Sequence, residues 1–362
     1  MLSDLDHMNR ALDLAERGRG TTSPNPMVGA VIVREDGTIA GQGYHERAGQ
    51  PHAEVRALEE AGDLARGASL YCSLEPCCHV GRTGPCVDRI IAAGITRVVA
   101  ASVDADARVS GRGFQVLRQA GIEVSVGPGR DRALRLNRAY FTFKTRGRPF
   151  VIMKAATSLD NRVAARARER TLLTSEDSQR HAHAVRAEVD AIAAGSETVL
   201  VDDPLLTARH VHRSRPLTRV VFDRRLRLPP SARVFSTLDA GPVIIVTTPQ
   251  MMANAPERAR GLERAGAELE ALTTGELPEA LARIANRQIT SVVLEGGVAI
   301  HKAAWNAGLV DAIHLYVAPV TLGPGGVSWL DVETVSVASL GDRRVTPLGV
   351  DVLMEGYVHG ID

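Results

Sequence analysis

One stretch of the chain, residues 52–86, restricts the possible folds and functions more than any other. It holds His52 and Glu54 near its start, Cys77 further along, and Cys86 at its end. One His and two Cys are typical ligands of a tetrahedral zinc ion whose fourth position stays open for water. Glu54, two residues after the His, is placed to move protons without binding the metal. The stretch therefore predicts a catalytic zinc site.

The order of these residues matches the signature of zinc nucleobase deaminases, H-x-E followed by P-C-x-x-C, with a longer insert of eight residues between Cys77 and Cys86. The alternatives are a structural zinc site or core thiols without a metal. Structural sites usually have four protein ligands, whereas the cleanest count here is three. The ligands also lead predicted helices, whose N-terminal dipoles favour an anionic water. Spacing alone leaves Cys78 open as a ligand.

The proposed chemistry needs a metal because a carboxylate alone cannot supply hydroxide at neutral pH. Zinc lowers the pKa of water from about 15.7 to about 7, which corresponds to roughly 12 kcal/mol. We expect Glu54 to take the proton of the water, pass it to a ring nitrogen of the base, and deliver one to the departing ammonia. For His45 and His79, which are in predicted loops, substrate contact or solvent exposure is favoured over zinc binding.

Length and charge exclude several other classes of function. The 362 residues are enough for two domains, each with its own core, and Lys plus Arg (43) nearly balances Asp plus Glu (42). No overall field therefore favours nucleic acid or a membrane as a partner. All four Cys lie within residues 72–86, as expected for a metal site and not for a disulfide framework. No signal peptide or apolar span is recognisable, so the cytoplasm is the expected compartment.

Strands and helices alternate along the chain, which predicts an α/β fold with a largely parallel sheet. The polar segment Arg146–Pro149 separates two such runs, so we expect domains at residues 1–146 and 147–362. In the first domain we expect helices at 5–15, 52–62, 87–93 and 113–120, and strands at 30–33, 38–41, 69–74, 96–103 and 122–126. In the second we expect helices at 182–187 and 298–306, and strands at 150–155, 190–194, 219–222, 243–247, 291–294 and 313–318.

Four segments of the first domain carry a more specific resemblance. They read PNPMVG at 24–29, GQGYH at 41–45, HAE at 52–54 and EPCCHVGRTGPC at 75–86. Together they resemble the bifunctional riboflavin-biosynthesis deaminase/reductase family. The resemblance implies a cytidine-deaminase-like α/β/α domain with zinc, followed by a dihydrofolate-reductase-like α/β domain that uses NADPH. It also implies a homo-oligomer, with a dimer favoured.

The implied reactions act on 2,5-diamino-6-(5-phosphoribosylamino)pyrimidin-4(3H)-one. An amino group is removed first, and the ribosyl unit is then reduced to ribityl with NADPH. By the same resemblance the zinc ligands are His52, Cys77 and Cys86, with Glu54 as the proton carrier. Ser is usual in the family where Cys78 stands, which argues against Cys78 as a ligand. The implied substrate contacts in this domain are Asn25, His45 and Arg82. On its own, Asn25 between two prolines could equally be a turn residue.

The resemblance continues through the second domain to the C-terminus. KAATSLD at 154–160, TVLVDDP at 198–204, LTAR at 206–209 and EGG at 295–297 resemble motifs of the reductase. A Gly-Gly turn between a strand and a helix lets backbone amides approach a phosphate, although alone it is only weak evidence for a nucleotide site. The implied catalytic residues are Lys154 and Asp202. The implied NADPH contacts are Ala156, Leu172, Thr198, Asp202, Gly297, Val298, Ala299, Ile300, His301 and Lys302. The implied substrate contacts are Arg170, Arg186, Leu206, Arg209 and Glu295, with Arg186 and Arg209 suited to the phosphate.

One segment departs from the family pattern. The family usually has Ser-x-Trp-Ile-Thr where this chain has Arg170-Thr-Leu-Leu-Thr174. The leading hypothesis is a bifunctional enzyme with a raised Michaelis constant in the reductase, because the residues that set the hydride geometry are retained and Arg170 can pair with a phosphate. The second is an active deaminase whose C-terminal domain only binds substrate or dimerises. The third, from another class, is a structural zinc module joined to an interaction domain.

Overall fold

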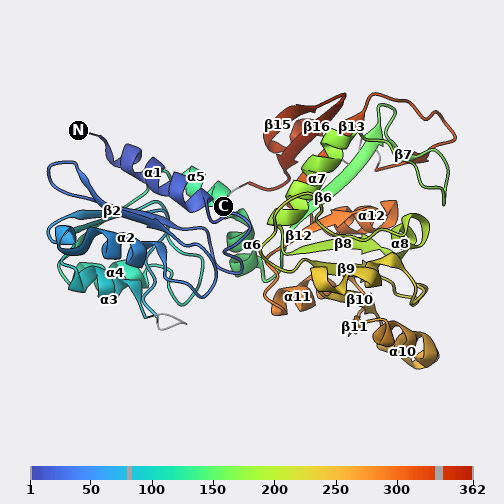
Figure 1. Cartoon of the computed structure of the whole chain (residues 1–362), viewed down its shortest axis with the longest axis horizontal. Helices are drawn as coiled ribbons and strands as arrows, with labels where there is room; N and C mark the ends of the chain where they lie inside the picture. Colours follow the sequence, from blue (N-terminus) through green and yellow to red (C-terminus); the bar gives the residue numbers. More distant parts are fainter. Residues whose placement is uncertain (1, 80–83, 331–336, 361–362) are drawn as a thin grey trace. The chain divides into compact units, whose positions relative to one another are not determined.

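The structure is a computed structural model that describes residues 2–79, 84–330 and 337–360. The chain divides into two compact units, one ending at Gly147 and the other beginning at Arg148 (Figure 1). Each unit has its own sheet and its own buried apolar clusters. Across the described residues, none of the helices has the length and apolar character needed to cross a membrane.

The first unit is a five-stranded sheet between two layers of helices, with strand order β2-β1-β3-β4-β5. Its elements, in chain order, are α1 (Asp4–Glu16), β1 (Gly29–Val33), β2 (Ile39–Tyr44), α2 (Ala53–Ala61), η1 (Gly62–Ala65), β3 (Ser69–Cys72), α3 (Cys86–Ala92), β4 (Arg97–Ala100), α4 (Arg112–Gln119), β5 (Glu123–Val126), α5 (Arg130–Leu136) and α6 (Arg138–Arg146). Helices α1 and α5 pack on one face, and α2, α3 and α4 on the other. The expected α/β/α fold is confirmed.

The sheet of this unit is mixed, and not largely parallel as the sequence predicts. Strand β1 is antiparallel to both β2 and β3, whereas β3, β4 and β5 are parallel. The β1–β2 pair is a hairpin, because Asp36-Gly37 allows a tight turn. All five residues of β1 are buried because helices cover both faces of the strand. Central strands covered on both faces read as continuous apolar runs whether their neighbours are parallel or antiparallel, so the pattern could not set the direction.

Close packing of α2 against β2 fixes the start of the metal-binding stretch. A Cβ on Gly41 would collide with the backbone of Ala57 and Ala61, so the strand needs glycine where the helix crosses it. His52 is the N-cap residue of α2, and Cys86 is the first residue of α3. Two of the three expected ligands therefore stand at helix N-termini, and Cys77 follows β3 in the connection to α3.

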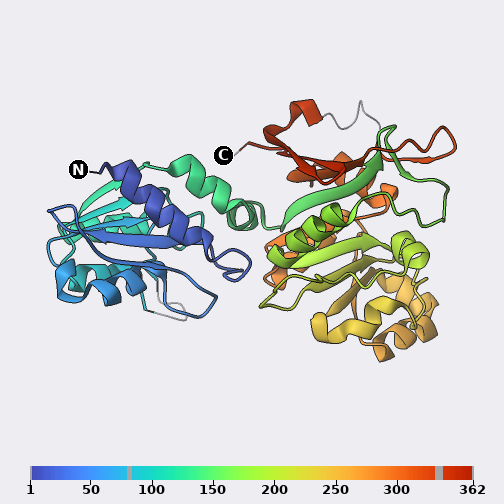
Figure 2. The same ribbon diagram turned by 45° about the horizontal axis from the view of Figure 1, so that its top comes forward.

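The second unit is built on a nine-stranded sheet, ordered β11-β10-β9-β8-β12-β6-β13-β16-β15, with helices on both faces (Figures 1 and 2). Its elements are β6 (Phe150–Ser158), β7 (Arg162–Ala164), α7 (Glu176–Glu188), β8 (Ala191–Gly195), α8 (Ser196–Asp202), β9 (Thr218–Phe222), η2 (Arg233–Ala240), β10 (Val243–Thr247), α9 (Pro249–Asn254), α10 (Pro256–Arg264), β11 (Ala267–Ala271), α11 (Leu277–Asn286), β12 (Ser291–Glu295), α12 (Val298–Asn306), β13 (Ala312–Ala318), β14 (Val327–Ser328), η3 (Val337–Ser339), β15 (Gly341–Leu348) and β16 (Asp351–Tyr357).

The strand order of this unit creates a crevice at the ends of β8 and β12. Across the sheet, the neighbouring strands β11, β10, β9, β8, β12, β6 and β13 are parallel to one another. Strands β16 and β15 then continue the sheet with antiparallel pairing. The chain leaves β8 toward β9 on one side, and leaves β12 toward β13 on the other side. In open α/β sheets, ligands bind outside the carboxyl ends of the strands where the direction of the connections reverses. This topology therefore predicts that the candidate site of the unit lies at the carboxyl ends of β8 and β12.

Candidate active sites

In the first unit, three ligand atoms meet in one cluster. The Nδ1 atom of His52 lies 3.2 Å from the Sγ of Cys86 and 3.5 Å from the Sγ of Cys77. All three ligand atoms are within 4.8 Å of one another. The sulfur of Cys78 instead lies 3.7 Å from the carbonyl oxygen of Arg108, outside the cluster. One imidazole nitrogen and two sulfurs, in reach of a common centre, form a donor set that fits zinc.

Hydrogen bonds within the cluster favour the thiolate form of one cysteine. The pKa of Cys77 is lowered to about 4, first because Cys86 hydrogen-bonds to its sulfur and then because His52 does. The backbone N–H of Cys86 also donates to this sulfur over 3.4 Å. A thiolate is the form of cysteine that binds metals. Its neighbours therefore favour the form of the Cys77 side chain that binds a metal cation.

Glu54 is a buried carboxylic acid beside the cluster. Its side chain is 3% exposed, and its Oε2 atom has no hydrogen-bond partner among the described residues. Burial raises the pKa of Glu54 to about 7. A buried polar atom without a partner normally marks a place where a water, ion or ligand belongs. The unpartnered oxygen and the three donors together fit a zinc ion with its water.

His45 and Asn25 lie next to the zinc ligands. The His45 ring is 5.3 Å from that of His52, edge to face, and only 2% of the residue is exposed. Its Nε2 is 3.1 Å from the Asn25 amide nitrogen, and its Nδ1 is 3.2 Å from the carbonyl oxygen of Pro51. Burial lowers the pKa of His45. The neutral ring therefore donates to Pro51 and accepts from Asn25, which orients the amide.

Glu75 anchors the turn that carries Cys77. Its two carboxylate oxygens accept four backbone N–H groups from the loop before α4 and from the first turn of α4, those of Asp104 (3.2 Å), Gly111 (2.8 Å), Gly113 (2.9 Å) and Phe114 (3.4 Å). The side chain is buried. A buried carboxylate with this many backbone donors is held in one place. The sequence analysis did not single out Glu75, because its partners are about 30 to 40 residues away.

In the second unit, a pocket of about 840 Å³ opens at the carboxyl ends of β8 and β12. Gly296 and Gly297 form its floor with left-handed φ angles of 78° and 86°. A Cβ on Gly296 would stand 2.9 Å from the side chain of Thr198 on α8. The glycines therefore permit a close approach of the two helix starts that a side chain would block. A backbone cradle at a helix N-terminus of this kind fits the phosphates of a nucleotide such as NADPH.

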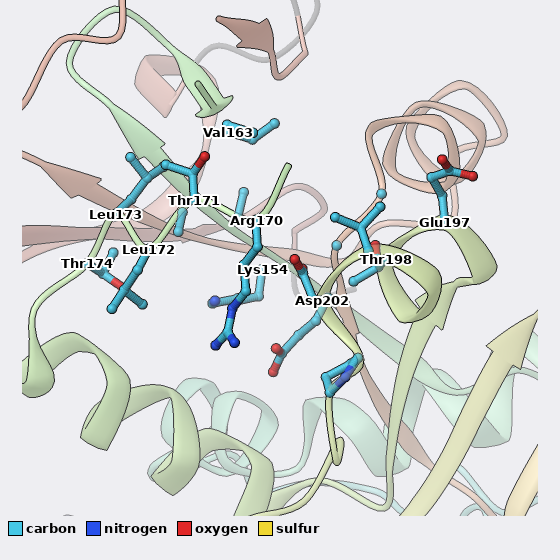
Figure 3. A pocket seen from close by; sticks show the side chains of 18 of the residues that line it. Lys154, Val163, Arg170, Thr171, Leu172, Leu173, Thr174, Glu197, Thr198 and Asp202 are labelled. Atoms are coloured by element: carbon cyan, nitrogen blue, oxygen red, sulfur yellow. The ribbon is translucent and has the colours of Figure 1, made fainter. Parts of the chain in front are cut away.

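Lys154, Asp202 and Arg170 project into the same opening (Figure 3). The Nζ of Lys154 lies 5.2 Å from the centre of the Tyr316 ring, and burial lowers the pKa of Lys154. Burial raises the pKa of Asp202, and the positive charge of Arg170 partly opposes that change. Arg170 and Leu172 are exposed, Leu172 by 71%. The pocket therefore combines two half-buried charged groups with an open rim.

Arg186 and Glu295 form a buried ion pair at the inner end of this pocket. The guanidinium donates from Nε and Nη2 to the two carboxylate oxygens over 2.6 and 2.5 Å, and from Nη1 to the carbonyl of Thr207 over 3.1 Å. Burial alone would raise the pKa of Glu295, but the charge and hydrogen bonds of Arg186 lower it to about 2. The carboxylate is thus ionised and fixed beside Lys154, its neighbour in the register of β12 and β6.

Comparisons with known proteins find a family model for each unit. Residues 1–102 match the model of the "cytidine and deoxycytidylate deaminase zinc-binding region", and residues 149–354 match that of the "RibD C-terminal domain". The riboflavin biosynthesis protein RibD of Aquifex aeolicus is 39% identical over 97% of this chain and 97% of its own length. That of Escherichia coli is 40% identical over 89% of each chain. This chain belongs to the RibD family.

Solved structures of the RibD family have the same fold over the whole chain. Acinetobacter baumannii RibD aligns with a TM-score of 0.86 at 33% identity, covering 98% of this chain and 99% of its own. A Thermotoga maritima protein described as a diaminohydroxyphosphoribosylaminopyrimidine deaminase/5-amino-6-(5-phosphoribosylamino)uracil reductase aligns with a TM-score of 0.81 at 31% identity, covering 98% of each chain. The resemblance seen in the sequence is confirmed, as is the expected pair of folds.

The RibD-like pocket gathers most of the residues that the sequence predicts for the reductase. Among them, those lining it are Lys154, Ala156, Arg170, Leu172, Arg186, Thr198, Asp202, Leu206, Arg209, Glu295, Gly297, Val298, Ala299 and His301. Ile300 and Lys302 are absent from the described lining: Ile300 packs against the apolar core, and Lys302 is exposed. Arg82 lies outside the described residues.

His301 lines the pocket, but both of its ring nitrogens are already used. Its Nδ1 is 3.0 Å from the indole nitrogen of Trp329, and its Nε2 is 3.2 Å from the carbonyl of Leu294. Burial lowers the pKa of His301 to about 4, so the ring is neutral, accepts from Trp329 and donates to Leu294. Neither ring nitrogen is therefore left to bind a cofactor.

Tyr316 and Arg233 are among the residues that line the pocket and that the sequence analysis did not name. Tyr316 stands on the buried strand β13, where its hydroxyl is 2.8 Å from Nδ1 of His181. Arg233 is the first residue of η2 and is exposed. A tyrosine in an apolar strand looks like a core residue, and an isolated arginine looks like surface, so neither had a local signal.

Proposed function

We propose that this chain catalyses two successive steps of riboflavin biosynthesis. The first is hydrolytic deamination of 2,5-diamino-6-(5-phosphoribosylamino)pyrimidin-4(3H)-one in the first unit. The second is reduction of the ribosyl unit of the product to ribityl by NADPH in the second unit. The observation that carries the proposal is the cluster of His52, Cys77 and Cys86 with the unpartnered oxygen of buried Glu54 beside it. The RibD-type pocket in the same chain supports the second step.

For the deamination, His52, Cys77 and Cys86 would hold zinc, which would supply an activated water at neutral pH. Glu54 receives the proton of that water, gives it to the ring nitrogen next to the reacting carbon, and later protonates the leaving ammonia. Its burial suits this exchange, because a carboxyl group with a pKa near neutrality both takes and returns a proton. Asn25, oriented by His45, presents its free amide atoms to the pyrimidine edge.

For the reduction, bound NADPH would supply a hydride to the first carbon of the ribosyl unit. The bond between that carbon and the ring oxygen must break, and the freed oxygen requires a proton, which Asp202 is suited to hold because burial raises the pKa of its carboxyl group. Lys154 lies over the Tyr316 ring and projects into the same opening. We assign it a place next to the carbon that receives the hydride. Glu295, held by Arg186, is assigned to bind hydroxyl or amino groups of the substrate.

A coupled assay on the purified, zinc-loaded chain tests both steps. Ammonia release and loss of NADPH absorbance are followed together after adding the diamino substrate. We expect ammonia first and NADPH oxidation second, with NADPH preferred over NADH. Ammonia release without NADPH oxidation, even at millimolar NADPH, would instead favour a deaminase whose second unit only binds substrate or dimerises. Absence of both would support a structural zinc module.

We also propose that the chain works in the cytoplasm as a homodimer. All four cysteines are free, and two of them are needed as metal ligands, which fits a reducing compartment. The outer strand β15 is largely exposed, and Val345 on it is 62% exposed. An exposed outer strand is a surface on which a second copy can pair. Light scattering coupled to size exclusion measures the mass, and we expect twice that of one chain.

A further inference from the structure

The loop that carries Asn25 has few backbone donors of its own. Pro24 and Pro26 flank Asn25, and neither has an N–H group that could donate to the rest of the fold. Met27 is therefore the first residue after Asn25 whose backbone N–H can fix the loop. Two residues later the chain enters strand β1. The partners of Met27 thus determine how firmly the Asn25 side chain is placed.

Asn137, which is 110 residues away in the sequence, holds both polar groups of the Met27 backbone. The Met27 N–H donates to Oδ1 of Asn137 over 2.8 Å, and Nδ2 of Asn137 donates to the Met27 carbonyl over 2.9 Å. Asn137 is only 3% exposed. An apolar side chain at this position would leave a buried N–H and a buried carbonyl without partners, which is costly. The Asn137 amide is therefore the anchor of the loop next to Asn25.

The place of Asn137 in the helices shows that its side chain is used for this contact. Asn137 joins α5 to α6: its backbone N–H donates to the Ala133 carbonyl over 3.2 Å, and its carbonyl accepts from the Phe141 N–H over 2.9 Å. An Asn at the start of a helix usually caps it by accepting from the first turn. Among the described residues, the Asn137 side chain forms no such bond to α6. The side chain therefore serves the contact with Met27 and not the cap of its own helix.

Helix α6 is also fixed to the metal-binding part of the unit. The Tyr140 hydroxyl donates to Oδ1 of Asp104 over 2.7 Å, and the Asp104 N–H donates to the Glu75 carboxylate over 3.2 Å. Glu75 stands two residues before the expected zinc ligand Cys77. One helix thus connects the loop of Asn25 with the turn of a metal ligand. A change at the start of α6 should therefore alter the position of one relative to the other.

We propose that Asn137 is a positioning residue of the deaminase, which sets the place of Asn25 relative to the metal cluster. The proposal rests on the proposed function, in which Asn25 contacts the pyrimidine edge. Asn137 acts on the base only through the loop that it holds at Met27. Its helix lies beyond residues 1–102, which match the zinc-binding family model, so the signature of that region did not reveal it.

A double-mutant cycle of ammonia release tests this role. Asn137→Ala, Asn25→Ala and the double variant are compared with the unmodified zinc-loaded chain. We expect Asn137→Ala to lower kcat/KM about ten- to hundredfold, because a displacement of about 1 Å at a binding group costs up to about 10²-fold. Zinc content should stay the same. Since Asn137 acts through Asn25, the double variant should be no slower than Asn25→Ala alone. Independent effects would multiply instead, and that result would overturn the proposal.

Two further variants guard against a trivial loss of structure. Thr145→Ala is the matched control, because Thr145 is exposed on the same helix and its hydroxyl donates to the Phe141 carbonyl within that helix. It should release ammonia like the unmodified chain. Asn137→Asp keeps the volume and the acceptor for the Met27 N–H, so its loss should be smaller than that of Asn137→Ala. Loss of zinc from both Asn137 variants would make Asn137 a structural residue of the whole unit and would also overturn the proposal.

A measurement without substrate separates this inference from the proposed function. Hydrogen exchange of the zinc-loaded chain, followed by mass spectrometry, reports on the backbone amides of residues 22–29. We expect faster exchange of this segment in Asn137→Ala than in the unmodified chain. If no chain releases ammonia but exchange rises in this way, the proposed function fails and Asn137 still positions the loop. If ammonia is released, and both exchange and kcat/KM are unchanged in Asn137→Ala, the function stands and Asn137 has no positioning role.

Discussion

The two sites of this chain are built in opposite ways. The zinc ligands and Glu54 all come from residues 52–86, and Glu54 is 3% exposed. The reductase pocket joins residues such as Arg186 and Glu295, which are 109 positions apart, and its rim includes Leu172 at 71% exposure. The first site concentrates its chemistry in a few enclosed atoms, whereas the second distributes binding over many side chains. One substitution should therefore abolish deamination, while single changes at the pocket rim should only weaken reduction.

The largest expected effect follows from Glu54→Gln. Because one carboxylate serves several proton transfers, we expect ammonia release to fall by at least about 10²–10⁴-fold, with zinc content unchanged. NADPH oxidation on already deaminated substrate should stay at the level of the unmodified chain. Glu59→Gln, an exposed position on the same helix, is the control. Loss of zinc in the Glu54 variant would instead show that Glu54 is a zinc ligand and not only a proton carrier.

The cysteines test how few atoms the first site depends on. We expect Cys77→Ser and Cys86→Ser each to lose most of the bound zinc on dialysis, because a hydroxyl is a poor substitute for a thiolate. Cys78→Ser should keep its zinc, since its sulfur points to the Arg108 carbonyl. Zinc per chain is measured by atomic emission, and ammonia release should follow it. Equal zinc loss in all three variants would mean that the ligand set includes Cys78.

A smaller effect is expected at the pocket rim. Restoring the family pattern with the double change Arg170→Ser and Leu172→Trp adds aromatic surface worth ~1–3 kcal/mol on burial. We expect the Michaelis constant for NADPH or for the deaminated substrate to fall roughly ten- to hundredfold, with little change in kcat. Leu159→Trp, at another exposed leucine outside the described lining, should change neither constant. A large gain in kcat would show that the rim sets the hydride geometry, and would contradict the view that rim residues only affect binding.

The second unit should also show a pH dependence of its stability. The pKa of His301 is lowered by burial to about 4 in the folded chain, below its unfolded value of about 6.5. The unfolded chain therefore takes up the proton first, so stability is complete above about pH 6.5 and falls between 6.5 and 4. The loss is up to about 3 kcal/mol for this residue. Both tryptophans, 305 and 329, belong to this unit, so their fluorescence during urea unfolding measures it.

His301→Asn is the comparison for this measurement. The variant has no titrating ring, so its stability should vary less with pH over the same interval. Trp329, which donates to His301, should show the change directly in its emission. His183 also has its pKa lowered to about 4, first by burial and then by the charges of Arg186 and Arg209, so some acid sensitivity should remain. An identical pH profile in both chains would remove His301 as its source.

The sequence predicts the first site better than the second for a physical reason. The zinc donors are near in sequence, and their spacing around α2 and α3 brings them together with few other elements involved. In the second unit, helix α12 and strand β10 have the expected bounds. The ion pair of Arg186 with Glu295, however, depends on β12 lying next to β8 in the sheet. The antiparallel pairing of β1 with β3, the helices α5 and α6, and Arg233 at the pocket had no local pattern to reveal them.

Through Glu75, the supply of zinc should affect how long the first unit stays folded. Its carboxylate joins the Cys77 turn to four amides, two of the loop between β4 and α4 and two of the first turn of α4. Zinc binds the folded form of this turn, so mass action stabilises the turn and the loop together, by about 2.7 kcal/mol when free zinc is a hundredfold above its dissociation constant. Among its described residues, the second unit has no cluster of metal ligands of this kind. A cell short of zinc should therefore accumulate chains cleaved within the first unit while the reductase half survives, a pattern that limited proteolysis with a chelator would reveal.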